Sequence, residues 1–291
     1  MQQYSVLMAV YHKEQPAQFR LAVSSMLRQT IPPKEIVVVC DGPLPQGLEQ
    51  VLREFGRRLR VIRLASHQGL GPALDIGLRS CRQELVARMD ADDIAVPERM
   101  EILLAEMERF PNASVIGGQI AEFSEDPGRI TGYRDVPTCP ENIRAFFKRR
   151  NPMNHMTVLL RKSSVLAVGS YQNMPNFEDY HLWARLLAAG YELRNVPAVC
   201  CLVRANCGLY ERRGGLGYFR DTCRLEWALW QLGLISVPRL CKNLAVRFAG
   251  TVLVSKRLRR RLYARYNRTR TLPEKGETDG IQVSRVSENA S

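Results

Sequence analysis

The stretch Glu84-Leu-Val-Ala-Arg-Met-Asp-Ala-Asp-Asp93 decides the fold that we expect for this chain of 291 residues. It begins with the apolar run Leu85–Ala87, which is typical of a buried strand. It ends in three carboxylates, Asp90, Asp92 and Asp93, which would repel one another if they were buried without partners. In extended backbone the first two of them point to the same side. Such a pair suits Mg²⁺ or Mn²⁺, because these cations favour oxygen ligands.

The same acidic residues also fit a turn without a ligand. In this interpretation Asp92 or Asp93 caps the helix that follows, and Pro97 suits the first turn of that helix. The acidic stretch alone leaves both interpretations open.

Apolar runs and helical periodicity alternate three times before the acidic stretch. The expected strands are Tyr4–Val10, Glu35–Cys40 and Arg60–Leu64, and the expected helices cover residues 19–27, 48–55 and 74–78. This alternation predicts an α/β fold with a mostly parallel, Rossmann-like sheet and helices on both faces. Ligands of such sheets bind at the C-terminal ends of strands. Asp41 and Asp90 both follow an expected strand, which favours a site over two unrelated turns.

The pattern continues less regularly after residue 97. A helix is expected to about Phe110, strands over 115–120 and 156–160, and a loop-rich segment over 124–140. A further helix opens at Phe177 and ends before Gly190, and residues 191–203 return as extended chain.

Four stretches together resemble glycosyltransferase family 2 enzymes of the GT-A fold, in the pattern of bacterial exopolysaccharide and O-antigen enzymes of the amylovoran-biosynthesis type. They are Ser5-Val-Leu-Met-Ala-Val-Tyr11, Val38-Val-Cys-Asp-Gly42, Met89-Asp-Ala-Asp-Asp93 and Phe177-Glu-Asp-Tyr-His-Leu-Trp183, with support from His67–Gly71 and Asn154–Val158. The resemblance covers about residues 4–205, and the order and spacing of the stretches are more specific than any one of them.

The resemblance implies metal-dependent transfer of a sugar, with inversion, from a nucleotide diphosphate donor to a hydroxyl. Family frequency favours a UDP-sugar. The implied donor and nucleotide residues are Val10, Tyr11, Glu14, Asp41, His67, Gly69, Asp90, Ala91 and Asp92, of which Asp90 and Asp92 also hold the divalent metal. Asp179 is implied as the general base, with Glu178 as its neighbour. His155, His181 and Arg212 are candidates for acceptor or diphosphate contacts; His181 stands where close relatives often carry Asp.

Several of these residues have an alternative structural role. Asp41 also fits an Asp-Gly turn, and acids such as Glu178 and Asp179 are favoured at a helix N-terminus by its dipole. His67 and Gly69 also fit a plain start of a helix, and a lone His155 fits a structural contact.

The positive charge of the chain lies near its C-terminus. Between Trp227 and Pro273 there is no Asp or Glu, and eleven cations there account for most of the net charge of +13. We expect a GT-A domain over 1–215, a basic amphipathic helical extension over 216–271 and a disordered tail over 272–291. Cations interleaved with aromatic residues suit an anionic membrane surface. No base-reading motif accompanies them, so no nucleic acid is expected.

The remaining composition favours a cytoplasmic protein. None of the eight cysteines forms a Cys-x-x-Cys pair, which argues against a structural zinc site and fits free thiols. Together with the basic segment, the resemblance implies an enzyme on the inner face of the plasma membrane that extends a lipid-linked glycan for surface polysaccharide. The alternative is an inactive nucleotide-sugar-binding or scaffold protein at the membrane.

Overall fold

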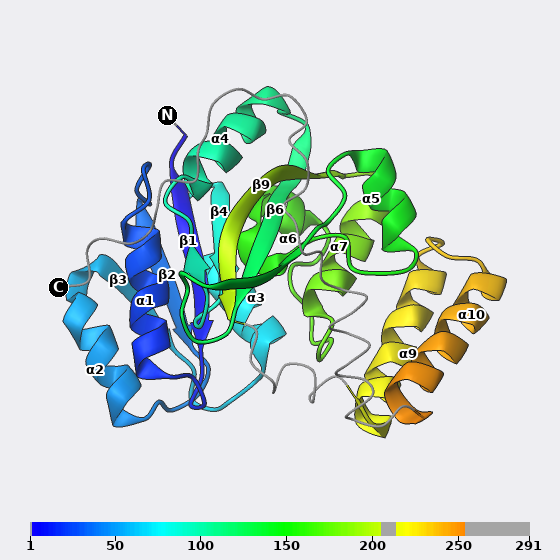
Figure 1. The fold of residues 1–291 in the computed structure, drawn as a ribbon, viewed down its shortest axis with the longest axis horizontal. Helices are drawn as coiled ribbons and strands as arrows, with labels where there is room; N and C mark the ends of the chain where they lie inside the picture. The colour runs from blue at the N-terminus through cyan, green and yellow to red at the C-terminus, as the bar shows by residue number, and fades with distance from the viewer. Residues whose placement is uncertain (1, 205–213, 254–291) are drawn as a thin grey trace.

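Four parallel strands form the first half of the sheet in the computed structural model, which describes residues 2–204 and 214–253 (Figure 1). They are β1 (Tyr4–Val10), β2 (Glu35–Cys40), β3 (Leu59–Arg63) and β4 (Leu85–Met89), in the order β3-β2-β1-β4. Asp41 follows β2 and Asp90 follows β4, and both strands pair with β1. The two acidic segments therefore lie at the same edge of the sheet, as predicted.

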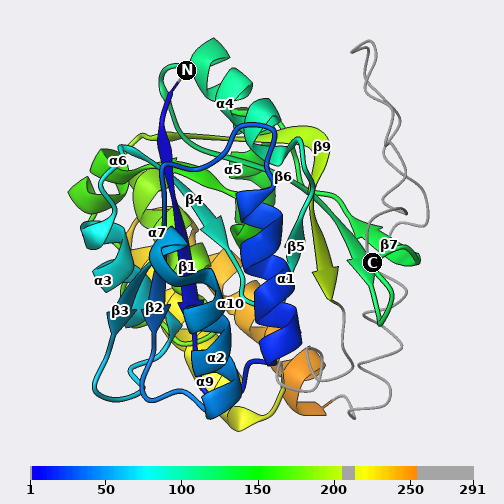
Figure 2. The same ribbon diagram turned by 90° about the vertical axis from the view of Figure 1, so that its left-hand side faces the viewer.

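Helices cover both faces of these strands. One core cluster contains α1 (Pro16–Leu27), α2 (Gln46–Phe55) and α4 (Arg99–Arg109), and the other contains α3 (Leu70–Ser80), α6 (Lys162–Ala167) and α7 (Glu178–Ala188). Figure 2 shows α1 and α3 on opposite sides of the strands. Side chains alternate between the clusters along each strand, so Val38 belongs to the first cluster while Val37 and Val39 belong to the second. Both faces need apolar side chains, which explains the continuous apolar runs and confirms the predicted α/β class.

The second half of the sheet is mixed. It contains β8 (Leu159–Arg161), β6 (Ala113–Phe123), β9 (Glu192–Arg204), β5 (Ile94–Ala95) and β7 (Ile130–Arg134). Strand β8 is antiparallel to β4 and β6, β9 is parallel to β6, and β5 and β7 pair antiparallel with β9 and β6. The β5–β9 pair brings the end of β9 next to the acidic stretch.

Two segments differ from the sequence-based expectation. The expected loop over 124–140 contains β7 and ends where helix α5 (Pro140–Phe147) begins. The expected strand over 156–160 starts instead as a 3-10 turn, His155–Thr157, before β8. Strand β7 forms a hairpin with the end of β6, whereas β8 pairs with the start of β6, which is distant in sequence.

Helices α9 (Leu216–Gln231) and α10 (Val237–Phe248) lie side by side beyond α5 and α7, before a π-helical turn at Ala249–Leu253 (Figure 1). Leu225 and Leu229 of α9 are fully buried in the core cluster that contains α7. The side chain of Asn243 on α10 donates hydrogen bonds to the Glu226 carboxylate at 2.9 Å and to a carbonyl of the loop after α5 at 3.2 Å. The α9–α10 pair therefore packs against α7 and the loop after α5.

Part of the sequence-based analysis falls outside the described residues. Arg212, the cations from Lys256 to Arg270 and the expected tail 272–291 all lie there. Within 2–204 and 214–253, every helix is too short or too polar to cross a lipid bilayer.

Candidate active site

Three carboxylates converge beyond the end of β4. Oxygen atoms of Asp90, Asp92 and Asp93 lie within 4.8 Å of one another. Helix α4 begins only at Arg99, and its capping position is occupied by Glu98 without a side-chain capping bond. The helix-capping role for the acidic residues is therefore wrong.

Asp93 is the most buried of the three. The backbone N–H of Arg204, at the end of β9, donates a hydrogen bond to its carboxylate at 3.0 Å. Burial raises the pKa of Asp93 well above its ordinary value, and the nearby Asp92 and Asp90 raise it further. A cluster of carboxylates with excess negative charge fits a hard divalent cation, which takes oxygen ligands and favours their charged form.

Asp41 organises a loop at the start of α3. Its carboxylate accepts hydrogen bonds from the backbone N–H groups of Gln68 at 2.7 Å and Gly69 at 3.0 Å, and His67 Nδ1 lies 2.8 Å from it. Gly42 has φ +88°, and a Cβ there would lie 2.8 Å from the His67 backbone nitrogen, so the turn requires glycine. A carboxylate has about four acceptor positions, so these contacts leave room for one more donor.

The rings of Tyr11 and His67 lie next to this loop. Their centroids are 5.8 Å apart with an interplanar angle of 24°, and the ring of His12 approaches both edge-on. The structure thus brings together Tyr11, Asp41 and His67, as the resemblance implied.

Val10, Ala91 and Glu14 were also implied as donor residues. The side chains of Val10 and Ala91 are buried in the core, so only their backbone groups are available at the strand ends. Glu14 closes the turn after β1, where its N–H bonds the Tyr11 carbonyl at 3.1 Å.

Asp179 lies in the first turn of α7. Its carboxylate accepts a hydrogen bond from the Asn151 side chain at 2.6 Å and one from the Tyr180 N–H at 2.7 Å. Burial raises the pKa of Asp179, while these hydrogen bonds and the cations Arg88 and Arg134 act in the opposite direction. Asn151 was missed in the sequence, because nothing near it in the chain points to Asp179.

Glu178 precedes Asp179 and shares its surroundings. Burial, followed by the nearby Asp179 charge, raises the pKa of Glu178 to about 7. Two neighbouring carboxyls that are difficult to ionise together are typical of a site that takes up a proton near neutral pH.

The candidate histidines are largely enclosed. His155 Nε2 lies 2.9 Å from the Tyr171 hydroxyl, and burial lowers the pKa of His155 well below its ordinary value. His181 is 8% exposed, and burial, with help from Arg185, lowers its pKa to about 4. Because helical residues are about 100° apart, His181 lies on nearly the opposite side of α7 from Asp179. Both rings are therefore held neutral.

Arg88 of β4 is a further residue that the sequence-based analysis quoted without assigning a role. Its guanidinium lies 2.5 Å from the Asp90 carboxylate, and its side chain is 3% exposed. In the sequence, its possible importance was indicated by its position as a cation inside an otherwise apolar strand.

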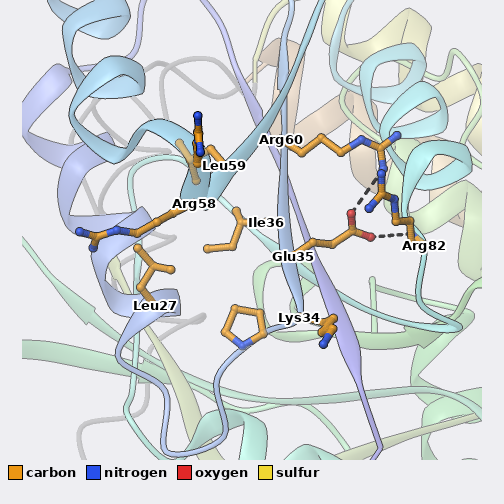
Figure 3. Close-up of a pocket in the computed structure, with 10 residues that line it drawn as sticks. Leu27, Lys34, Glu35, Ile36, Arg58, Leu59, Arg60 and Arg82 are labelled. Atoms are coloured by element: carbon orange, nitrogen blue, oxygen red, sulfur yellow. Dashed lines mark hydrogen bonds and ion pairs between the residues drawn. The ribbon is translucent and has the colours of Figure 1, made fainter.

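A separate pocket lies at the opposite ends of β2 and β3 (Figure 3). It has a volume of about 420 Å³ and is lined by cations that include Lys34, Arg58 and Arg60. Its carboxylate, Glu35, bonds the Ser5 hydroxyl at 2.7 Å and the Arg82 N–H at 2.5 Å. These contacts join strand and helix ends, away from the acidic edge.

The sequence is similar to a known protein family and to individual glycosyltransferases. The family described as Glycosyl transferase family 2 matches residues 5–168. The chain is 38% identical to the amylovoran biosynthesis glycosyltransferase AmsE of Erwinia amylovora, over 80% of this chain and 88% of that protein. It is 31% identical to the UDP-Gal:alpha-D-GlcNAc-diphosphoundecaprenol beta-1,3-galactosyltransferase of Escherichia coli, over 84% of this chain and 89% of that protein.

A solved structure shares the fold at low sequence identity. The crystal structure of S. aureus TarS in complex with UDP-GlcNAc superposes with a TM-score of 0.66 and 16% identity, covering 86% of this chain and 73% of that one. The family match spans more than half of the chain, from the first strand to the end of α6. The protein is thus a glycosyltransferase, and it belongs to glycosyl transferase family 2.

Proposed function

We propose that this enzyme transfers a sugar, with inversion, from a UDP-sugar to a hydroxyl of a lipid-linked glycan in surface polysaccharide biosynthesis. The observation that carries the proposal is a buried cation, Arg88, that is paired with the acidic edge beyond β4 and acts electrostatically on the two carboxyls at the start of α7. Arg88 bonds Asp90 and also acts electrostatically on Asp179 and Glu178. A donor-binding end and a proton-accepting end therefore share one site.

The donor half of the proposal rests on β1, β2 and β4. Tyr11, Asp41 and His67 would hold the nucleotide base, and Asp90 and Asp92 would hold the diphosphate side. Relatives support the nucleotide, since the E. coli relative is named for UDP-Gal and the TarS structure contains UDP-GlcNAc.

A divalent cation fits the acidic cluster of Asp90 and Asp92. When bound, Mn²⁺ or Mg²⁺ would neutralise the charge that develops on the departing UDP. The protein side chains would orient the diphosphate and keep the sugar's anomeric carbon open to attack from the other face.

Asp179 is the proposed general base. The acceptor oxygen forms a bond to the anomeric carbon while the bond from that carbon to the diphosphate oxygen breaks. The proton of the acceptor hydroxyl passes to Asp179, and UDP leaves with the electron pair of the broken bond. A single base on the face opposite the leaving group gives inversion. Glu178 would position the acceptor beside it.

The extension supplies a surface for the membrane. On α9 the side chains of Trp227 and Trp230 are 53% and 36% exposed, with ring centroids 4.7 Å apart. Exposed cations such as Arg224 and Lys242 lie on the same helix pair. Exposed aromatic residues among cations suit the interface of an anionic bilayer. We therefore place the enzyme on the cytoplasmic face of the plasma membrane, where it would meet a lipid-linked acceptor.

A transfer assay tests the proposal. The full chain, with Mn²⁺ and a GlcNAc-diphospholipid acceptor, is incubated in turn with labelled UDP-galactose, UDP-glucose and UDP-GlcNAc. One donor should give a labelled lipid, and Asp179→Asn should lower kcat by about 10²–10⁴-fold, the range for general acid–base catalysis, while UDP binding is retained. Nucleotide binding without transfer to any hydroxyl acceptor would contradict the proposal and favour a scaffold protein.

A further inference from the structure

Arg88 is a buried guanidinium that contacts the acidic edge at Asp90 and acts electrostatically on the carboxyls at the start of α7. It extends from β4 on the same face as Val86, into the core cluster that contains α3 and α7. Its side chain is 3% exposed, which is rare for a cation because burial removes its hydration. A buried charge of this kind needs partners.

Its contacts are few and specific. Nη2 bonds Asp90 at 2.5 Å, whereas Nε and Nη1 are buried and have no hydrogen-bond partner among the described residues. The carboxylates of Asp90 and Asp179 are among the groups that favour the charged form of Arg88. In return, Arg88 lowers the pKa of Asp93, Glu178 and Asp179, which burial raises.

Arg88 therefore acts on carboxyls of both the acidic edge and α7. Arg134 acts on Asp179, and His155, which bonds Tyr171, is held neutral. Resting on the function proposed above, we propose that Arg88 is a positioning residue for sugar transfer. Its guanidinium holds Asp90 on the donor side by direct contact, and its positive charge acts on Asp179 on the acceptor side.

The proposal predicts a loss that falls mainly on the rate. Without the guanidinium, Asp90 loses its ion-pair partner and Asp179 loses the effect of a nearby positive charge, but Asp92 would still hold the donor. Arg88→Met should therefore lower kcat by about 10²–10³-fold, as removal of one preorganised hydrogen-bond donor does, while the Kd for UDP with Mn²⁺ rises by less than about tenfold. A purely structural arginine would affect the melting temperature and leave kcat of the folded enzyme unchanged.

Arg88→Lys separates charge from shape. Lysine keeps the charge but lacks the planar fork that holds a carboxylate with two N–H groups. The Arg88→Lys variant should have a kcat between those of wild type and Arg88→Met. If Arg88→Met does not fold, Arg88→Lys decides alone: a kcat at least about fivefold below wild type supports the proposal, and a wild-type kcat overturns it.

Arg99 provides a matched control. It is equally buried, on the other face of β4, and bonds the Arg88 carbonyl at 2.7 Å; no carboxylate of residues 2–204 or 214–253 pairs with it. Arg99→Met should lower the melting temperature and change kcat by less than about threefold.

The experiment measures kcat, UDP affinity and melting temperature for the full-length wild type and these variants, with the sugar donor that the wild type uses. Wild-type transfer with an unchanged kcat in Arg88→Met would overturn the role of Arg88 alone. A wild-type enzyme with neither UDP binding nor transfer would instead overturn the proposed function.

Discussion

Asn151 and Asp179 form the shortest side-chain contact of the proposed base, with 2.6 Å between the amide nitrogen and the carboxylate oxygen. This bond both orients the carboxylate and favours its charged form. We expect Asn151→Ala to lower kcat by about tenfold, the lower part of the range for losing a positioning hydrogen bond, with UDP affinity unchanged.

Asn154→Ala is the control for this prediction. The Asn154 side chain is buried and bonds the Gly118 carbonyl at 2.9 Å, which fixes the backbone of β6. It should lower the melting temperature and leave kcat of the folded enzyme near wild type. Steady-state kinetics and thermal unfolding distinguish the two; equal kcat losses would contradict the specific role of Asn151.

The raised pKa of Glu178, about 7, predicts a pH dependence in the neutral range. At low pH a proton is held by the Glu178–Asp179 pair, so kcat should rise as the pH increases through about 7. Glu178→Gln removes the like charge beside Asp179, so the rise should move to lower pH. Profiles of kcat between pH 5 and 9 test this; superimposable profiles for the two enzymes would exclude the coupling.

The same shift has the opposite sign for stability. The folded-state pKa of Glu178 lies above its ordinary value of 4.5, so protonation favours the folded state. This contribution is present below pH 4.5 and is lost as the pH rises through about 7. The optimum for activity should therefore lie above the pH at which this residue stabilises the fold most.

The chemical types of the main site residues could be predicted from the sequence, but their connections could not. Asp90, Asp92 and Asp179 stand in recognisable stretches. Arg88 and Asn151 gain their role only from residues far away in the chain, because the fold brings β4, the loop after α5 and α7 together. Short-range patterns do not contain that information.

At the scale of elements, helix α9 has two faces with different tasks. Leu225 is fully buried against the core, whereas Trp227 is 53% exposed. Leu225→Ala should lower the free energy of unfolding by about 2–5 kcal/mol, as other buried leucines do. Trp227→Ala should leave the melting temperature nearly unchanged but weaken binding to vesicles that contain phosphatidylglycerol.

Sedimentation with anionic and with neutral vesicles, beside thermal unfolding, tests this division. Wild-type binding should require the anionic lipid and fall as NaCl rises from about 0.1 to 1 M, where the Debye length shrinks from about 10 to 3 Å. Binding that is equal for both vesicles, or unaffected in Trp227→Ala, would contradict a membrane role for this face.

The elements themselves followed from the sequence to different degrees. The parallel half was predictable because β1, β2 and β4 are almost fully buried and mostly apolar. Strand β7 and helix α5 are short and lie among prolines and glycines, so their periodicity is weak. Pairing with β6 and burial of Ile143 and Phe147 stabilise them, and both contacts are made only in the folded chain.

At the scale of the whole molecule, the sheet and the helices on it bring the proposed donor side and the proposed base together. In the proposed function, β2 and β4 carry the donor side and α7 carries the base; α9 packs on α7, and its Trp227 and Trp230 are exposed. Membrane docking through α9 would therefore place the acceptor side of the site near the lipid. The central claim is that the acidic edge beyond β4 binds the nucleotide diphosphate through a metal.

Thermal unfolding with nucleotide tests that claim most directly. Wild type, Asp92→Asn and Asp179→Asn are heated with UDP, GDP or TDP, each with and without Mn²⁺. A ligand at about 100 times its Kd stabilises the folded state by about 2.7 kcal/mol. The account predicts an increase in melting temperature with UDP that requires Mn²⁺, is lost in Asp92→Asn and is retained in Asp179→Asn. An increase that persists in Asp92→Asn or is independent of Mn²⁺, or no increase with any nucleotide, would contradict it.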